Sequence, residues 1–374
     1  MTATAQGQRF ELANQQLSQA LKLVSGVVES SQVMQVLANV HFSLDQTRLT
    51  LTTSNSEMEV VTEVATTTQE TCCFTVSARK LLDITRALSD DATIELCYQG
   101  QWLHVRAGSS VFKLATLPAE SFPFFQDEVD AKVSALPASQ LLRHLVKTGF
   151  SMARQDVRVF LNGVFLSLSE EGLVTVSSDG HRLSYMKSDA AHEAHGVMII
   201  PRRTVQELVR LLTGMGDAPI QLSFTDRVAV FSAETFTLRT HLIDGQYPPY
   251  QKLIPQHLPH QMSLPTLQLK QILQRVGICA NEKFRGVRFD IKSGQLDISA
   301  HNFEQEVAKE QLPITYAAED VNISFNMQYL QDVIGILDTE SLSFSFNQSD
   351  ASVLIEPVSD EQIKYVVMPL TLTS

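Results

Sequence analysis

Three similar segments decide the fold: SARKLLDITRAL at residues 77–88, PRRTVQELVRLL at 201–212 and NMQYLQDVIGIL at 326–337. In the first segment Leu81, Ile84 and Leu88 have the i, i+3, i+7 spacing of a helix with one buried face. The second segment begins 124 residues after the first, and the third begins 125 residues after the second. The chain therefore contains an internal repeat, and each copy is predicted to contain this helix.

A second helical pattern precedes each segment, so the sequence predicts two helices in every repeat. Ser77, Pro201 and Asn326 are suited to begin the later helix of each pair. The six predicted helices cover residues 13–28, 78–88, 137–149, 201–212, 265–277 and 326–337.

Between the two helices of each repeat the sequence alternates between apolar and other residues, as a strand with one buried face requires. The alternating positions are Val40, Phe42 and Leu44, then Val164, Leu166 and Leu168, then Val287, Phe289 and Ile291. Return strands begin at Leu49, Leu173 and Leu296. Stiff proline-bearing joints follow, LPAESFPFF at 117–125 and LIDGQYPPY at 242–250. Each repeat thus contains about six to eight strands and two helices packed on one sheet face.

These observations predict an α+β protein with three similar domains, at residues 1–128, 129–255 and 256–374. Similar units joined by similar stiff linkers are related by similar rotations, which produces an arc. Such an arc closes most simply through a symmetric dimer.

The composition predicts an ordinary cytoplasmic protein. The N-terminal sequence MTATAQGQRF lacks the basic and apolar regions of a signal peptide, and no apolar run is long enough to cross a membrane. Cys72, Cys73, Cys97 and Cys279 show no metal-ligand or redox spacing. We therefore expect reduced thiols, with no metal, cofactor or catalytic residue.

The net charge of −12 is unevenly distributed. The six helical segments contain eleven of the 29 basic residues and three of the 41 acidic ones, so they carry +8 and the rest of the chain carries −20. A positive inner face of helices would hold DNA through its phosphates without reading its sequence. Shallow contacts of this kind permit sliding.

Several longer segments resemble one known family, the bacterial DNA polymerase III β subunits, or β sliding clamps. The resemblance runs from Arg9 to Leu372. Its most specific stretches are FSMARQDVRVFLNG at 150–163, SDGHRL at 178–183, NEKFRGV at 281–287 and YVVMPL at 365–370.

The resemblance implies half of a homodimeric ring, with helices lining the hole around double-stranded DNA. It further implies a non-catalytic processivity factor whose partners are the clamp loader, replicative and translesion DNA polymerases and mismatch repair proteins. These partners would insert a short peptide into a hydrophobic pocket between the second and third domains. The implied pocket residues are Leu161, Ser178, Gly180, His181, Arg182, Leu183, Pro248, Lys252, Leu253, Asn326, Tyr329, Ser352, Val366, Met368, Pro369 and Leu370.

Two further sets of residues follow from the resemblance. The implied DNA contacts are Arg79, Arg86, Arg154, Gln155, Arg202 and Arg203. The implied dimer contacts pair Lys80 and Phe112 of the first domain with Ile278, Cys279, Glu304, Glu306 and Glu310 of the third.

The sequence departs from the family pattern at four places. The loop GVVESSQ at 26–32 lacks an arginine that the family often uses for DNA. Val159 replaces a common aromatic residue, Lys252 a common arginine, and Thr371 a basic residue near the C-terminus. The first departure concerns a DNA contact of the family, and the others concern its affinity for the peptide.

Two rival functions are open at this point. An enzyme could use Asp179 and His181, although no nucleophile elbow, phosphate-binding loop or HExxH motif accompanies them. A three-domain scaffold could bind only proteins and never DNA, although the segregation of charge disfavours it.

Overall fold

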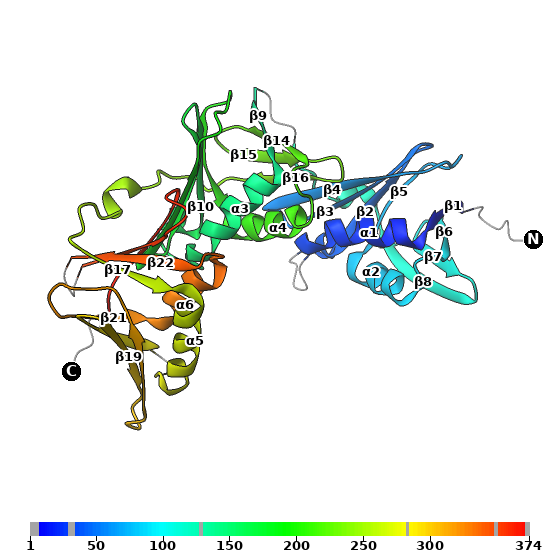
Figure 1. Ribbon diagram of the computed structural model, residues 1–374. Coiled ribbons are helices and arrows are strands. Elements are labelled where there is room, and N and C mark those ends of the chain that lie inside the picture. The colour runs from blue at the N-terminus through cyan, green and yellow to red at the C-terminus, as the bar shows by residue number, and fades with distance from the viewer. Residues whose placement is uncertain (1–6, 29–33, 127–129, 282–283, 348–350, 371–374) are drawn as a thin grey trace, which may run out of the picture. The chain divides into compact units, whose positions relative to one another are not determined.

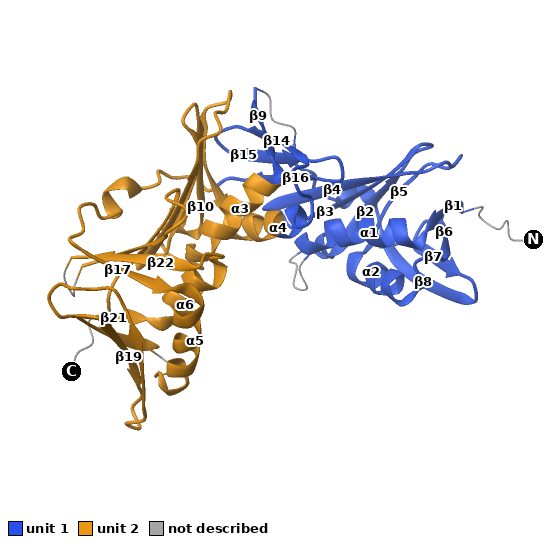
Figure 2. Ribbon diagram, viewed as in Figure 1, with its two compact units in different colours: residues 1–138, 210–242 blue, residues 139–209, 243–374 orange. Residues whose placement is uncertain are grey.

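The computed structural model describes residues 7–28, 34–126, 130–281, 284–347 and 351–370 (Figure 1). The chain divides into two compact units (Figure 2). Unit 1 contains Met1–Ala138 and Arg210–Leu242, and unit 2 contains Ser139–Val209 and Ile243–Ser374. The second repeat thus contributes strands to both units. The domain limits predicted at 128 and 255 remain a prediction.

All six predicted helices are present. They are α1 (Asn14–Val24), α2 (Ala78–Ala87), α3 (Ala138–Thr148), α4 (Arg202–Leu212), α5 (Thr266–Val276) and α6 (Met327–Ile336). The first predicted helix was too long at its C-terminal end, because the chain tightens into a 3-10 turn at Ser25–Val27. The side chains of Ser77 and Asn326 cap α2 and α6, as predicted. No helix within the described residues is both long and apolar enough to cross a membrane.

Each repeat contains eight strands within the described residues, at the upper end of the prediction. The first repeat has β1 (Gln8–Ala13), β2 (Asn39–Leu44), β3 (Arg48–Ser54), β4 (Met58–Ala65), β5 (Cys72–Ser77), β6 (Thr93–Gln99), β7 (Trp102–Ala107) and β8 (Ser110–Leu117). The second has β9 (Lys132–Pro137), β10 (Gly163–Ser169), β11 (Gly172–Ser178), β12 (Arg182–Ser188), β13 (Gly196–Pro201), β14 (Pro219–Phe224), β15 (Val228–Ser232) and β16 (Thr237–His241). The third has β17 (His260–Pro265), β18 (Gly286–Lys292), β19 (Gln295–His301), β20 (Val307–Pro313), β21 (Val321–Asn326), β22 (Ser341–Phe346), β23 (Val353–Pro357) and β24 (Ile363–Val367).

Two groups of four strands recur in all three repeats: the first, sixth, seventh and eighth strands pair in that order, and so do the fifth, second, third and fourth. Within the described residues the two groups of one repeat are joined directly only in the first repeat, through β5 and β8. Unit 1 contains a twelve-stranded sheet in the order β1-β6-β7-β8-β5-β2-β3-β4-β16-β15-β14-β9. Unit 2 contains an eight-stranded sheet, β13-β10-β11-β12-β24-β23-β22-β17, and a four-stranded sheet, β20-β19-β18-β21. The fourth strand of one repeat pairs with the eighth strand of the next, as β4 with β16 and β12 with β24. Neighbouring repeats are therefore joined by main-chain hydrogen bonds.

The predicted apolar positions form the cores. In the third repeat Leu269 of α5, Leu330 of α6 and Phe289 of β18 are fully buried in one hydrophobic cluster. In the first repeat α1 packs against α2, with Leu17 and Leu81 fully buried. This is the arrangement that the helical and alternating patterns predict, with helices covering one face of antiparallel sheets.

Candidate functional site

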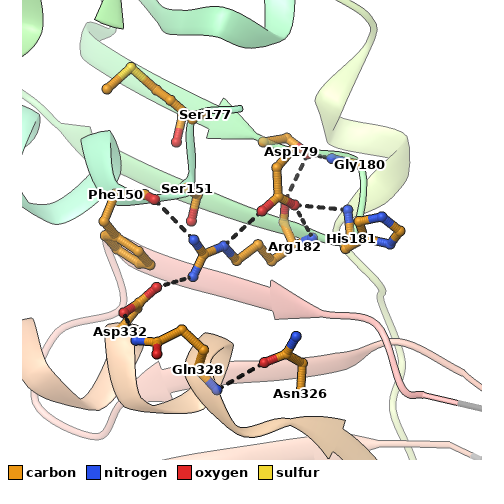
Figure 3. A network of polar contacts seen from close by, with 12 residues as sticks. Phe150, Ser151, Ser177, Asp179, Gly180, His181, Arg182, Asn326, Gln328 and Asp332 are labelled. Carbon is orange, nitrogen blue, oxygen red and sulfur yellow. Dashed lines mark hydrogen bonds and ion pairs between the residues drawn. The ribbon is translucent and has the colours of Figure 1, made fainter. Parts of the chain in front are cut away.

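Arg182, the first residue of β12, lies at the centre of a polar network in unit 2 (Figure 3). Its side chain is only 9% exposed. The guanidinium donates from Nε to Asp179 Oδ2 at 3.0 Å and from Nη1 to Asp332 Oδ2 at 2.6 Å. Nη2 donates to the carbonyl of Phe150 at 3.1 Å. The planar fork of an arginine suits these three acceptors, and it ties the second repeat to α6 of the third.

The turn before Arg182 is held by the carboxylate of Asp179. Its Oδ1 accepts hydrogen bonds from the backbone N–H groups of His181 at 3.0 Å and Arg182 at 3.1 Å. Gly180 has a φ of +88°, which favours glycine. The His181 ring instead lies near Tyr329, with ring centroids 6.4 Å apart. Asp179 is therefore engaged in the turn rather than with the imidazole, which weakens the acid and imidazole pairing that an enzyme would need.

An apolar surface continues from this network along the β12·β24 pair. Leu183 and Val366 lie directly opposite each other and are 3% and 4% exposed. They belong to a small cluster with Val176 and Leu354. The side chains of Phe165, Val174, Tyr185, Tyr247, Tyr250, Ile254 and Leu258 pack around that cluster.

At the edge of this surface Met368 is 47% exposed and Leu253 is 52% exposed. Large apolar side chains this exposed beside a buried apolar cluster suit the capture of a hydrophobic partner.

All of the predicted pocket residues belong to unit 2, and the structure brings several of them into contact. The N–H of Met368 donates to the carbonyl of His181 at 2.9 Å, so the chain after β24 lies against the turn. The N–H of Leu370 donates to the backbone carbonyl of Ser324 at 2.7 Å. Leu161 and Ser178 are buried, whereas Gly180, His181 and Lys252 are exposed. The half-buried members are Pro248, Asn326, Tyr329, Ser352, Pro369 and Leu370.

Sequence reasoning missed several residues of this site. Tyr247 and Tyr250 belong to the apolar surface, and the repeated aromatic residues of the joints were the signal that could have identified them. Burial raises the pKa of the Tyr247 hydroxyl well above its ordinary value. Phe150 and Asp332 were not predicted as partners of Arg182, because they are distant from it in sequence.

The predicted DNA-contacting residues occur in both units. Arg79 and Arg86 are exposed on α2 of unit 1. In unit 2, Arg154, Gln155 and Arg203 are exposed. Arg202 is half-buried, and it donates from Nη1 to the carbonyl of Met152 at 2.9 Å. Burial, followed by the positive charges of Arg154 and Arg182, lowers the pKa of Arg202.

Part of the predicted helical charge is bound within the chain. Arg143 forms an ion pair with Asp360, and Lys147 donates to the carbonyl of Ile336. Arg275 of α5 donates two hydrogen bonds to Glu310, at 2.5 and 2.6 Å. Counting residues therefore overstated the free positive charge of α3 and α5.

The predicted dimer contacts lie on or near two strands, β8 in unit 1 and β20 in unit 2, that are incompletely paired along one side within the described residues. Within the described residues, β8 pairs with β5 only at Thr116 and Leu117. The rest of that side of β8, which includes Phe112, has no partner strand in the part of the chain that the structure describes. Among the strands described in unit 2, β20 pairs only with β19. Ile278 is 82% exposed and Val307 of β20 is 66% exposed. The remaining predicted residues Lys80, Glu304 and Glu306 are exposed, while Cys279 and Glu310 are half-buried.

The sequence matches the three domain families of one protein along almost its whole length. The N-terminal domain of the DNA polymerase III beta subunit matches residues 8–126, the central domain 135–249 and the C-terminal domain 251–371. Beta sliding clamps from Pseudomonas putida and Escherichia coli are each 36% identical over 97% of this chain and all of the relative.

Solved structures show the same similarity. The crystal structure of the DNA polymerase III subunit beta from Pseudomonas aeruginosa has a TM-score of 0.93 and 35% identity, covering 97% of this chain and all of that one. A sliding clamp from the same organism bound to griselimycin has a TM-score of 0.93 and 36% identity, covering 98% of this chain and all of that one. The chain therefore belongs to the DNA polymerase III beta subunit family, the beta sliding clamps.

Proposed function

We propose that two copies of this chain form a closed ring that encircles duplex DNA, slides along it and tethers DNA polymerases to it. The chain is a non-catalytic accessory subunit that acts in the cytoplasm. Its peptide site receives the clamp loader, replicative and translesion polymerases and mismatch repair proteins. It needs no cofactor or metal, and it does not act at a membrane.

The repeated strand order is the observation that carries this proposal. The fourth strand of the first repeat pairs with the eighth of the second, and the fourth of the second with the eighth of the third. The same rule pairs β20, the fourth strand of the third repeat, with β8, the eighth strand of the first. Within one chain those edges have no such partner among the described residues. A second copy supplies both missing pairs at once through a two-fold axis.

The rule also predicts the register of the intermolecular pair. Val60 lies opposite Leu238 in one joint, and Ser184 lies opposite Tyr365 in the other. The equivalent positions of the third and first repeats are Ala308 and Leu114. We therefore expect Ala308 of one copy opposite Leu114 of the other, which places Glu310 opposite Phe112.

DNA is held through its phosphates. Exposed Arg79 and Arg86 on α2, and Arg154 and Arg203 in unit 2, supply positive charge without a motif that reads base edges. Contacts of this kind hold any sequence equally well, and so permit sliding.

The topology of DNA binding tests the proposal directly. Chains loaded on nicked circular DNA should stay bound through gel filtration and be lost after the circle is cut once. The alternative, a scaffold that binds only proteins, predicts no retention on either form. Retention on linear DNA with free ends would contradict encirclement, because an ordinary DNA-binding protein behaves in that way.

A further inference from the structure

The first and second repeats meet at a strand pair that has the same arrangement as the strand pair at the proposed peptide site, and each such meeting of two repeats is called a joint here. There β4 pairs with β16 just as β12 pairs with β24 at the next joint. Glu59 lies opposite Arg239 in the first joint, and Leu183 lies opposite Val366 in the second. These two pairs hold equivalent positions of the repeat, so an ion pair at one joint replaces an apolar pair at the other.

The Glu59–Arg239 pair is built into its joint. Glu59 is 2% exposed. Arg239 donates from Nη1 to Glu59 Oε1 at 3.1 Å, and the backbone N–H of Phe125 donates to Glu59 Oε2 at 3.2 Å. The carboxylate therefore also fixes the end of the joint segment 117–125. Removing Arg239 would take away a cation that is 3.1 Å from the buried Glu59 carboxylate.

A cavity lies beside this pair. It has a volume of about 280 Å³, and its lining includes Val228, Val230 and Arg239. By strand register these three are the counterparts of Ser352, Leu354 and Val366, which lie at the proposed peptide site. Phe224 and Ala131 add further apolar lining, and Gln126, Ser223 and Thr225 add polar lining. The first joint thus has a partly apolar space at the equivalent position, with a guanidinium on its wall.

We infer that the first joint is a latent second peptide site, which the Glu59–Arg239 pair keeps closed. This inference rests on the proposed peptide-binding function of the second joint. A hydrophobic anchor that entered the cavity would have to displace or desolvate the guanidinium and its carboxylate. At the second joint the equivalent residues Leu183 and Val366 carry no charge that an incoming anchor would have to desolvate. The ion pair therefore confines the clamp-binding peptide to one site per chain.

The test replaces the ion pair with the residues of the second joint. The variant carries Glu59→Leu and Arg239→Val, because exchange of a buried ion pair for apolar residues is tolerated far better than loss of one partner. The probe is a fluorescein-labelled peptide carrying the clamp-binding segment of a replicative polymerase. Isothermal titration of the full-length protein should give one peptide per chain for the wild type and two for the variant, the second bound more weakly.

A matched control removes the exposed ion pair between Arg48 and Glu63, whose atoms are 3.2 Å apart on the neighbouring strands β3 and β4. The variant Arg48→Val with Glu63→Leu should still bind one peptide. If the first variant loses its cooperative unfolding transition, Glu59→Gln with Arg239→Met, which keeps the side-chain lengths, takes its place.

The possible failures are distinguishable. A folded variant that still binds one peptide per chain would overturn the inference and leave the proposed function intact. Binding of two peptides per wild-type chain would also overturn the inference and leave the proposed function intact. A wild type that binds no peptide contradicts the proposed function itself, and the inference with it.

Discussion

Asp332 accepts a hydrogen bond at 2.6 Å from the guanidinium of Arg182, which lies 150 positions earlier in the chain. The two residues belong to the third and second repeats, so this contact fastens α6 to β12, the strand that borders the proposed peptide site. The same guanidinium lies over the Tyr329 ring, 4.5 Å from its centroid. One side chain therefore contributes both to the contact between the two repeats and to the wall of the proposed peptide site.

Arg182→Ala should destabilise the protein by about 3 kcal/mol, because it leaves two partly buried carboxylates without their cation. Urea unfolding followed by circular dichroism measures the change. Arg182→Lys should not restore stability, since an ammonium group cannot reach all three acceptors in one plane. Arg48→Ala, which breaks an exposed ion pair, is the control and should leave the unfolding midpoint unchanged. Equal midpoints for the two alanine variants would refute the structural role of Arg182.

Met368→Ala should weaken peptide binding roughly tenfold without altering stability, because an exposed apolar anchor contact is lost. Fluorescence anisotropy of a labelled clamp-binding peptide gives the dissociation constant. Val358→Ala serves as the control, since Val358 is also exposed, at 60%, but lies outside the proposed site. The same loss of affinity in both variants would argue against this location of the site.

Val307→Asp should convert the dimer to a monomer, because it places a charge in the proposed β20·β8 contact. Light scattering should give a mass near 41.6 kDa for the variant and near twice that value for the wild type. Val197→Asp is matched in exposure, at 64% against 66% for Val307, and lies on β13. Only the Val307 variant should dissociate, and a monomeric wild type at micromolar concentration would contradict ring closure.

Arg79→Glu with Arg86→Glu should shorten the retention of the protein on nicked circular DNA and reduce the salt dependence of binding, because two phosphate contacts are lost. Retention at increasing salt concentration measures the effect. The control is Arg106→Glu, which reverses the charge of an exposed arginine on strand β7. Loss of retention in this control would mean that net charge, rather than the α2 surface, holds DNA.

His144 should make the protein sensitive to acid. Burial lowers the pKa of its imidazole to about 3, and the ring hydrogen-bonds with Thr175 at 3.0 Å and Ser188 at 3.1 Å. Because the folded-state pKa lies below the unfolded value of about 6.5, the unfolded chain binds more protons between those two pH values. The contribution of the neutral His144 ring to the free energy of unfolding is therefore present above pH 6.5, and it falls as the pH drops toward 3.

Between pH 6.5 and pH 3 the free energy of unfolding should fall by on the order of 4 kcal/mol because of His144. Unfolding midpoints from pH 7 to pH 4 should fall less steeply in His144→Gln than in the wild type. His181→Gln, which changes an exposed histidine, should keep the wild-type slope.

The helices could be predicted from sequence because their signals are local. The spacing of Leu81, Ile84 and Leu88 and the capping side chain of Ser77 lie within one segment, and the structure has α2 there. The strand order could not be predicted, since the pairing of β4 with β16 joins residues about 180 positions apart and depends on the whole packing.

The candidate site shows the same division between local and distant information. The motif SDGHRL indicated a functional turn, and the structure shows Asp179 and Gly180 shaping it. The motif did not reveal that Arg182 is largely enclosed, because its acceptors Phe150 and Asp332 come from elsewhere in the chain. For the same reason the ion pair of Arg275 with Glu310 was invisible when charges were counted by segment.

The β12·β24 ladder has a consequence for fragments of the protein. The main-chain hydrogen bonds of this ladder and the Arg182 contacts join the second and third repeats without using the covalent linker. Asp244, Gly245 and Gln246 in that linker are exposed and open to a protease. A chain cut there should remain assembled, and two separately expressed halves should find each other and restore the native structure by complementation.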